Sequence, residues 1–335
     1  MRCRKASNGY SSKVMNLWSY RAIDHLSIPY MERSQVKEIV KGVGATAVGI
    51  ARVAEVDAAA RQSYLHWIES GRSAPLGYMD RYHEVRNNPR LLLDGANSII
   101  VAAFSYYYPT PAAKSHFTIA RYARGADYHD VVRRRLNDAV TAIIAETALD
   151  PSDFRVCVDT APLRERYWAR KAGVGFIGRN NALIVPGEGS YMVLGEILTT
   201  MELDADAPCT LTCGNCMACV KRCPAGALDC DEDGYCGVDA SRCLSCLTIE
   251  HRGDFPEEIK LGGRIAGCDT CQDVCPHNRH AKTSPIAEFA PSNPLLDMTD
   301  DQILSLRAED IRPLTRHTSL SRIKPSDFIR NIHTP

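Results

Sequence analysis

The apolar positions before residue 208 alternate between a helical period and short continuous runs. Helical spacing is found over residues 34–42, 57–70, 130–148 and 163–172. In the second of these segments, Leu65 and Ile68 are expected on the buried face. Continuous apolar runs at 45–51, 98–104, 154–158, 182–185 and 191–198 predict strands. The pattern therefore predicts an α+β protein with an α/β domain over residues 31–208.

The two ends of the chain have a different composition from this domain. Residues 1–30 carry five basic side chains and no acid before Asp24, which resembles a transit peptide, but we favour a disordered or untranslated extension before Met31. Residues 286–335 predict a short helical tail after a proline-containing linker. From Ile311 onward the tail has only one acidic residue, Asp327. Its basic residues there are Arg312, Arg316, Arg322, Lys324 and Arg330. This imbalance is a modest indication of nucleic-acid binding.

The overall composition restricts the compartment and the kind of partner. The chain has 335 residues, 45% of them apolar, and 40 basic residues balance 40 acidic ones, so only a local patch can attract a polyanion. It has neither a secretory signal nor an apolar run of bilayer length. We therefore expect a cytoplasmic protein without a membrane segment.

Most of the fourteen cysteines lie in one array within residues 209–285. The array opens at Cys213 with the spacing C-x2-C-x2-C-x3-C-P, and it closes at Cys275-Pro276. This spacing is typical of bacterial ferredoxins with two [4Fe-4S] clusters, in which the fourth cysteine of a run binds the other cluster. The prediction is a ferredoxin-like domain whose first cluster is bound by Cys213, Cys216, Cys219 and Cys275, and whose second is bound by Cys223, Cys243, Cys268 and Cys271.

Other uses of these thiols are less favoured. Zinc, disulfides or buried thiols would each suit a single C-x2-C pair, but not eight cysteines in this order with two Cys-Pro signatures. The remaining cysteines are interpreted as ordinary thiols, and they are Cys3, Cys157, Cys209, Cys230, Cys236 and Cys246. Cys246 is the one most easily exchanged with a ligand, because it lies close to Cys243.

Two further motifs each allow a functional and a structural interpretation. Asp159 follows an apolar strand, where burial would raise its pKa and suit a general acid, but it could equally cap the next helix. For Asp127 we favour the start of a helix.

The glycines at 173, 175 and 178 match the motif G-x-G-x-x-G. However, a helix precedes them and a strand follows, which is the reverse of the order at a dinucleotide-binding site. We expect a loop that approaches a neighbouring backbone or a large flat cofactor.

Several motifs in fixed order resemble the epoxyqueuosine reductase family. They are Val158-Asp-Thr-Ala-Pro162, Ala172-Gly-Val-Gly-Phe-Ile-Gly-Arg-Asn180, Leu194-Gly-Glu-Ile-Leu-Thr199, Arg242-Cys-Leu-Ser-Cys-Leu-Thr-Ile-Glu250 and Gly267-Cys-Asp-Thr-Cys-Gln-Asp-Val-Cys-Pro276. The resemblance extends from about Met31 to the tail. It departs from the family pattern at Cys246, where an aromatic residue is usual, and at Phe176, where tryptophan is commoner. The chain also stops at Pro335, where many relatives continue into a helical-repeat domain, so less surface for tRNA is expected.

The resemblance implies a cobalamin cofactor, a catalytic domain akin to that of reductive dehalogenases, and reduction of epoxyqueuosine to queuosine at the wobble position of tRNA. It places Asp159 at the family's proposed proton donor. It also implies cobalamin contacts from Arg166, Asn180, Cys268 and Asp269, and weaker expectations of cofactor or tRNA contact for Tyr122, His129 and Ser245. We expect a monomer that receives electrons from ferredoxin or flavodoxin. The alternatives are a cobalamin-dependent reductase of a small molecule and a ferredoxin-type electron carrier.

Overall fold

The computed structural model describes residues 31–230, 236–255 and 259–335. The extension 1–30 with Cys3, and the side chains of Cys230 and Cys236, lie outside the described residues. None of the described helices is both long and apolar enough to cross a bilayer.

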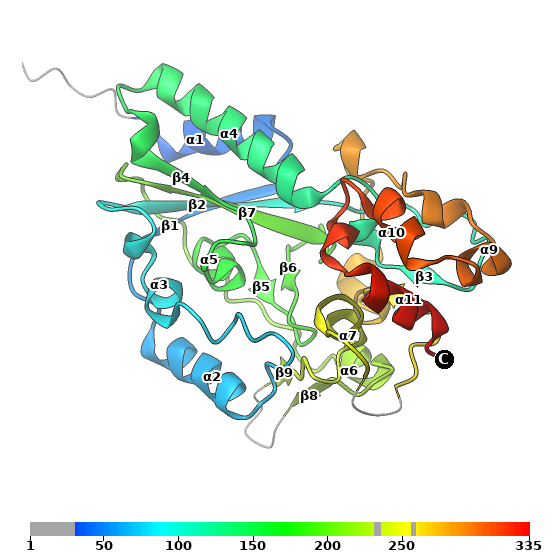
Figure 1. Cartoon of the computed structure of the whole chain (residues 1–335). Helices are drawn as coiled ribbons and strands as arrows, with labels where there is room; N and C mark the ends of the chain where they lie inside the picture. Colours follow the sequence, from blue (N-terminus) through cyan, green and yellow to red (C-terminus); the bar gives the residue numbers. More distant parts are fainter. Residues whose placement is uncertain (1–30, 231–235, 256–258) are drawn as a thin grey trace, which may run out of the picture.

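A four-stranded antiparallel sheet forms the centre of the larger part of the molecule (Figure 1). Its strands follow the order β1 (Ala47–Arg52), β2 (Ser98–Ser105), β7 (Met192–Thr199) and β4 (Phe154–Cys157). All eight residues of β2 are buried, because neighbouring strands cover its edges and helices cover its faces. The four strands lie within a residue or two of the predicted runs, and the α+β class is confirmed.

Helices cover both faces of this sheet. On one face, α1 (Arg33–Gly42) and α4 (Tyr128–Glu146) pack through Val36, Val40, Leu136 and Ile143, all fully buried. On the other face, α5 (Glu165–Lys171) packs through Trp168 and Ala169. The short pair β5 (Phe176–Ile177) and β6 (Leu183–Ile184) follows α5.

One predicted burial is wrong. The second predicted helix exists as α2 (Ala58–Glu69), followed by α3 (His83–Asn87), but α2 has no buried residue and Leu65 is 41% exposed. The helix lies at the periphery of the molecule, and its Trp67 donates a hydrogen bond to the Val238 carbonyl at 2.7 Å. The prediction of a helix in this segment is therefore confirmed, but the apolar side of the helix does not face the core.

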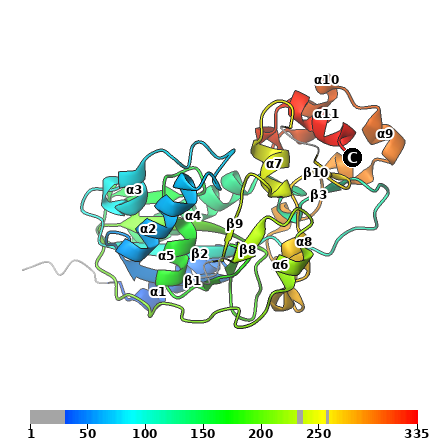
Figure 2. The ribbon, with the colours of Figure 1, turned by 90° about the horizontal axis from the view of Figure 1, so that it is seen from below.

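The cysteine array and the C-terminal helices form the second part of the molecule, beside the sheet (Figure 2). The array contains α6 (Ala218–Arg222), the hairpin β8 (Leu228–Cys230) and β9 (Cys236–Val238), α7 (Leu244–Glu250), β10 (Arg264–Ala266) and α8 (Thr270–Asp273). The tail contains α9 (Asp300–Leu304), α10 (Ala308–Thr315) and α11 (Pro325–His333).

Non-local pairings join the two parts. Strand β10 pairs in parallel with β3 (Thr118–Ile119), a segment inserted between β2 and α4. Ile119 and Ile265 of this pair share a hydrophobic core with Phe328 of α11. Ile286 instead packs into the core beneath α1 and α4. The tail is therefore an integral part of the fold.

We expect Gly49→Ala to destabilise the protein by about 1–3 kcal/mol, because overpacking a tight contact forces the backbone to move. A Cβ atom at Gly49 would lie 1.9 Å from the Ala172 carbonyl oxygen, which belongs to the turn after α5. Gly42→Ala is the control, since a Cβ there meets nothing within 4 Å. Urea denaturation measures both. Equal unfolding free energies for the two variants would contradict the packing argument.

Candidate active site

The four thiols predicted for the first cluster line one cavity. Cys213, Cys216 and Cys219 come from the segment that enters α6, and Cys275 comes from the turn after α8. The space at this site is about 300 Å³, a volume that includes open solvent at the mouth of the cavity. Burial raises the pKa of Cys275, and the neighbouring thiols Cys213 and Cys216 raise it further. Cys275 therefore lies beside Cys213 although about sixty residues separate them in the sequence. This is the arrangement expected when the last cysteine of each run binds the other cluster.

The remaining thiols form a second group. Burial raises the pKa of Cys243, and its charged neighbours are Cys268 and Cys223. Burial likewise raises the pKa of Cys271, with contributions from Cys268, Cys243, Cys219 and Cys223. Because Cys219 belongs to the first group, the two groups are adjacent.

Cys246 does not share the environment of the second group. Burial is the main cause of the raised pKa of Cys246, and the charges of Cys243, Glu250 and Asp239 add to it. The other predicted ligands of the second cluster, Cys223, Cys268 and Cys271, do not contribute. In contrast, backbone N–H groups of Ser245 and Cys246 donate to the Cys243 thiol, which precedes α7. These contacts favour Cys243 as the ligand.

The described thiols do not converge on a site for a single metal ion. Within the described residues, no three Cys, His, Asp or Glu side chains approach closely enough to hold one metal ion. Zinc requires four ligand atoms at about 2.0–2.3 Å from one point. Binding of two [4Fe-4S] clusters by these thiols remains a prediction from their spacing in the sequence.

Asp159 and His129 form the second chemical centre. Asp159 lies two residues beyond the end of β4, and His129 lies in the first turn of α4. His129 Nε2 is 2.9 Å from Asp159 Oδ2, and His129 Nδ1 is 2.6 Å from Asp127 Oδ1. Asp127 also accepts the His129 backbone N–H at 3.0 Å, which confirms its expected role at the helix start. The imidazole is therefore held between two carboxylates.

This arrangement places the proton on the histidine. Burial lowers the pKa of His129, but the hydrogen bonds to Asp127 and Asp159 outweigh it and raise the pKa to about 9. Burial raises the pKa of Asp159, but the hydrogen bond and charge of His129 hold it below its usual value. The expected upward shift of the Asp159 pKa is wrong, because sequence alone did not show the paired imidazole.

The capping role considered for Asp159 is also wrong. Helix α5 begins at Glu165, after Arg164, and no side chain caps it. Instead, the Asp159 backbone N–H donates to Glu165 Oε1 at 2.6 Å. Burial and the charge of Asp159 raise the pKa of Glu165 to about 7.

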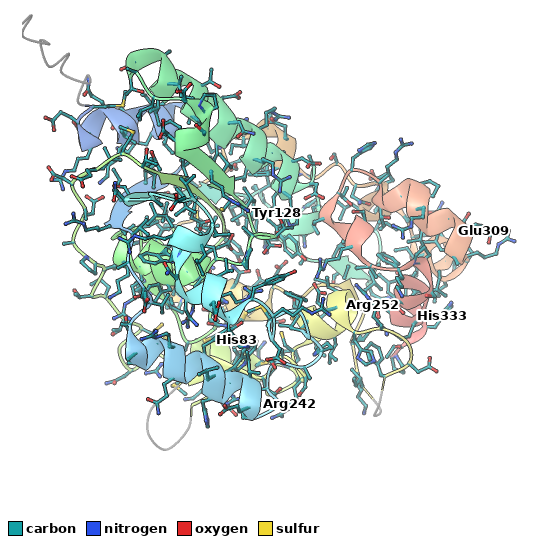
Figure 3. The ribbon with its side chains drawn as sticks, turned by 60° about the vertical axis from the view of Figure 1, so that its left-hand side comes forward. His83, Tyr128, Arg242, Arg252, Glu309 and His333 are labelled. Atoms are coloured by element: carbon teal, nitrogen blue, oxygen red, sulfur yellow. The ribbon has the colours of Figure 1, made fainter. Side chains whose placement is uncertain are left out.

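Tyrosines surround Asp159. Tyr122 and Tyr128 make an edge-to-face contact with ring centroids 5.9 Å apart, and Tyr128 stacks on His129 at 4.0 Å. Tyr128 lies at the beginning of α4, between the sheet and the C-terminal helices (Figure 3). Burial raises the pKa of Tyr78 to about 12, and the charges of Glu250 and Asp159 also raise it. Tyr128 and Tyr78 were missed, because aromatic residues next to a helix or in a loop carry no specific sequence signal.

A hydrogen bond links α5 to the loop that borders the first thiol cavity. Arg166 follows Glu165 and donates a hydrogen bond to the Asn181 carbonyl. Asn180, one residue earlier, lines the cavity of Cys213 and Cys275. The Asn180 side-chain Nδ2 is buried, without a hydrogen-bond partner among the described residues. Arg166 and Asn180, expected to lie near one cofactor, are therefore connected through the Asn181 backbone.

The glycine loop has the packing role that we expected. A Cβ atom at Gly175 would lie 2.3 Å from the Ile184 carbonyl oxygen, so the loop must approach the neighbouring strand closely. Gly173 has φ of 73°, in the left-handed region.

Asp269 and Ser245 lie at the edge of this region. Asp269 accepts the Arg121 backbone N–H at 2.8 Å, next to Tyr122, and burial raises its pKa to about 6. Ser245 contacts Cys243 and Thr248 of its own helix. The structure therefore brings Asp269, but not the Ser245 side chain, into contact with the tyrosine segment.

Much of the basic charge of the tail is paired within the protein. Arg322 binds Glu250 through two hydrogen bonds and lies 5.4 Å from the Tyr78 ring centre. Arg330 lies 3.9 Å from the Phe255 ring centre, and Arg312 donates to the Ser321 carbonyl. Arg322 therefore connects the tail to the tyrosines around Asp159, which the sequence did not indicate.

Comparison with known proteins identifies the family. Residues 86–160 match the family model "Epoxyqueuosine reductase QueG, DUF1730", and residues 212–278 match the model of a 4Fe-4S double cluster binding domain. An epoxyqueuosine reductase from Synechococcus sp. (strain CC9605) is 40% identical over 79% of this chain and 81% of its own length. The chain belongs to the epoxyqueuosine reductase family. A member from Gloeobacter violaceus is 36% identical over 89% of this chain and 93% of its own length.

Solved structures of epoxyqueuosine reductases have the same fold. A crystal structure of one with an epoxyqueuosine-modified tRNA stem loop aligns with a TM-score of 0.78 and 28% identity, over 89% of this chain and 79% of that chain. A structure from Bacillus subtilis, described with its catalytic aspartate loop swung out of the active site, aligns with a TM-score of 0.77, 27% identity and the same coverage.

We expect Cys243→Ser to lose one cluster, leaving about four of eight irons, because one of four thiolate ligands is missing. Cys246→Ser is the matched control and should retain both clusters. Iron analysis and electron paramagnetic resonance after anaerobic reconstitution measure the outcome. Loss of iron from Cys246→Ser alone would reverse the assignment.

We expect His129 to titrate with a midpoint near pH 9, as measured by histidine-selective NMR. Its folded pKa exceeds the ordinary value of 6.5. The stabilisation from the two carboxylates is therefore complete below the unfolded pKa and is lost as the pH rises toward 9.

Asp127→Asn should lower this midpoint by about one unit or more, since asparagine still caps α4 but carries no charge. Asp130→Asn, whose side chain is 77% exposed in the same turn, is the control. A wild-type midpoint near 6.5 would contradict the paired imidazole.

Proposed function

We propose that this protein reduces epoxyqueuosine in tRNA to queuosine, with the His129–Asp159 pair as its proton source. The observation that carries this proposal is the connection between two chemistries. A histidine that holds a proton between two carboxylates is joined by α5 and the loop at Asn180–Asn181 to a cavity lined by four thiols. A simple electron carrier has no need of such a proton site.

The reaction needs both parts. Removing the epoxide oxygen as water and leaving a carbon–carbon double bond consumes two electrons and two protons. His129 carries a proton at neutral pH, and Asp159 Oδ2 accepts its hydrogen bond at 2.9 Å. Asp159 is half exposed and His129 is only 20% exposed, so Asp159 is the member of the pair that reaches substrate. We propose that Asp159 passes the proton of His129 to the departing epoxide oxygen, and that the second proton of the water formed comes from solvent.

The family resemblance implies cobalamin, and the residues present suit it. Arg166, Asn180, Cys268 and Asp269 would hold the cofactor, and Tyr122 and His129 are further candidates for contact with it. The orphaned Asn180 amide is the buried donor that a bound group would satisfy. Reduced cobalamin supplies a strong low-potential nucleophile. The chain's own residues orient the substrate and control its protons.

We propose that the eight cysteines bind two [4Fe-4S] clusters in the crossed arrangement, with the catalytic part at 31–208, the cluster part at 209–285 and the tail at 286–335. The adjacency of the two thiol groups favours transfer of single electrons between them. A cytoplasmic ferredoxin or flavodoxin is the expected donor to a monomeric enzyme.

We propose that the tRNA anticodon loop enters beside Tyr78 and the tail. An unpaired nucleotide can be turned out of a loop and recognised by stacking on aromatic rings. Tyr78 is 41% exposed, and it lies close enough to Asp159 for the charge of that carboxylate to raise the pKa of Tyr78. Arg316 and Lys324 are exposed on the tail and suit phosphate contacts. Ser245 is a further candidate for substrate contact, on α7.

The reaction is tested by incubating anaerobically reconstituted protein with a low-potential reductant and epoxyqueuosine-containing tRNA, followed by mass spectrometry of the nucleosides. We expect queuosine to appear. Its absence from protein that contains both clusters and cobalamin would reject the proposed substrate.

Asp159→Asn should lower kcat by roughly 100-fold or more, the usual range for loss of a general acid. Asp159 has a φ of 50°, a left-handed conformation that asparagine also tolerates, so iron and cobalamin should remain bound. Asp138→Asn, at an exposed position of α4, is the matched control. Unchanged turnover by Asp159→Asn would reject the acid role and leave the reaction itself standing.

A further inference from the structure

The backbone of Asp159 has a conformation that the chain does not adopt by itself. Its φ is 50°, in the left-handed region, where residues other than glycine are held only by their surroundings. Its backbone N–H donates a hydrogen bond to Glu165 Oε1 at 2.6 Å. The Asp159 backbone is therefore bound by the Glu165 side chain, six residues further along the chain, in the same conformation in which the Asp159 carboxylate contacts His129.

Glu165 is well placed to fix this backbone. It is the first residue of α5, and the same helix buries Trp168 and Ala169 against the sheet. The loop at 158–164 contains no regular structure beyond short turns. The rigid end of the contact is therefore the helix, and the adjustable end is the loop that carries Asp159.

A neighbouring acid explains why Glu165 can carry the charge. Glu196 of β7 is fully buried, and neither of its carboxylate oxygens has a hydrogen-bond partner among the described residues. Burial raises its pKa well above the usual value, with further contributions from Glu165 and Asp159. Glu196 therefore keeps its proton. Its partner across the strand pair is Cys157.

Glu165 faces a mixed set of charges. Burial raises its pKa to about 7 and Asp159 adds to the rise, whereas the Asp159 backbone N–H, Arg166 and His129 oppose it. The ionised carboxylate is the stronger acceptor for the Asp159 amide. It is available to a substantial fraction of molecules at neutral pH, unlike that of Glu196.

We propose that Glu165 is a positioning residue that holds the Asp159 loop in its proton-delivering conformation by accepting the Asp159 backbone N–H. The inference rests on the proton role of Asp159 proposed above. Without this acceptor, the loop would leave the left-handed conformation and carry the carboxylate away from His129.

Amide hydrogen exchange of the loaded enzyme tests the contact directly. Glu165→Ala removes the acceptor, Glu165→Gln keeps an oxygen acceptor without charge, and Glu196→Gln replaces an acid that is already neutral. For peptides that contain Asp159, we expect Glu165→Ala to exchange roughly tenfold faster or more, the effect of losing a hydrogen bond to a charged group. Glu165→Gln should exchange at an intermediate rate, and Glu196→Gln at the wild-type rate.

Turnover gives an independent readout. Glu165→Ala should lower kcat roughly tenfold or more and change KM for tRNA much less, because the loop acts on the chemical step. Glu165→Gln should restore most of kcat. Wild-type exchange in Glu165→Ala would overturn the proposal, and so would a Glu165→Gln enzyme as slow as Glu165→Ala with normal exchange, since that outcome indicates a proton-transfer role.

The exchange measurement requires no turnover. If the wild-type enzyme failed to convert epoxyqueuosine, the proposed function would be rejected, yet the protection of the Asp159 amide by Glu165 would still be decided. Iron and cobalamin contents of each variant establish that it is folded and loaded.

Discussion

A protonated imidazole between two carboxylates is the interaction on which the catalytic arrangement depends. His129 has Asp127 on one nitrogen and Asp159 on the other, so neither carboxylate is left without a partner at neutral pH. The same bonds fix the start of α4 and the end of β4 relative to each other. A charge pair of this kind tolerates partial burial because both charges are hydrogen-bonded. Tyr128 stacks on the imidazole of this pair and in turn contacts Tyr122.

The second constraint is the return of the chain to its own cluster site. Cys275 lies beyond the second group of thiols in the sequence but completes the first. Strand β10, which comes just before Cys268 in the chain, pairs with β3. Strand β3 in turn lies next to Arg121 and Tyr122. The thiol array is therefore attached to the same segment that supplies the tyrosines, so electron and proton chemistry share one framework.

Much of this could be predicted from the sequence because its signals were local. Buried strands appear as continuous apolar runs, and cluster ligands appear at fixed short spacings. The remainder depended on tertiary partners. The pKa of Asp159 is set by His129, thirty residues away, and the exposure of Leu65 depends on where α2 is attached. Glu165 and Glu196 were not recognised, since an isolated acid in a helix or strand gives no indication that another carboxylate lies near it.

The crossed arrangement of ligands has a consequence for damage by oxygen. Each proposed cluster is held by cysteines from both ends of the array, so destruction of one cube releases a stretch of chain that also carries a ligand of the other. The second cube then loses its enclosure and becomes accessible to the same oxidant. Damage to one cube therefore leaves the other bound but more exposed, so partly oxidised molecules would pass through a form with one remaining cube before they lose both.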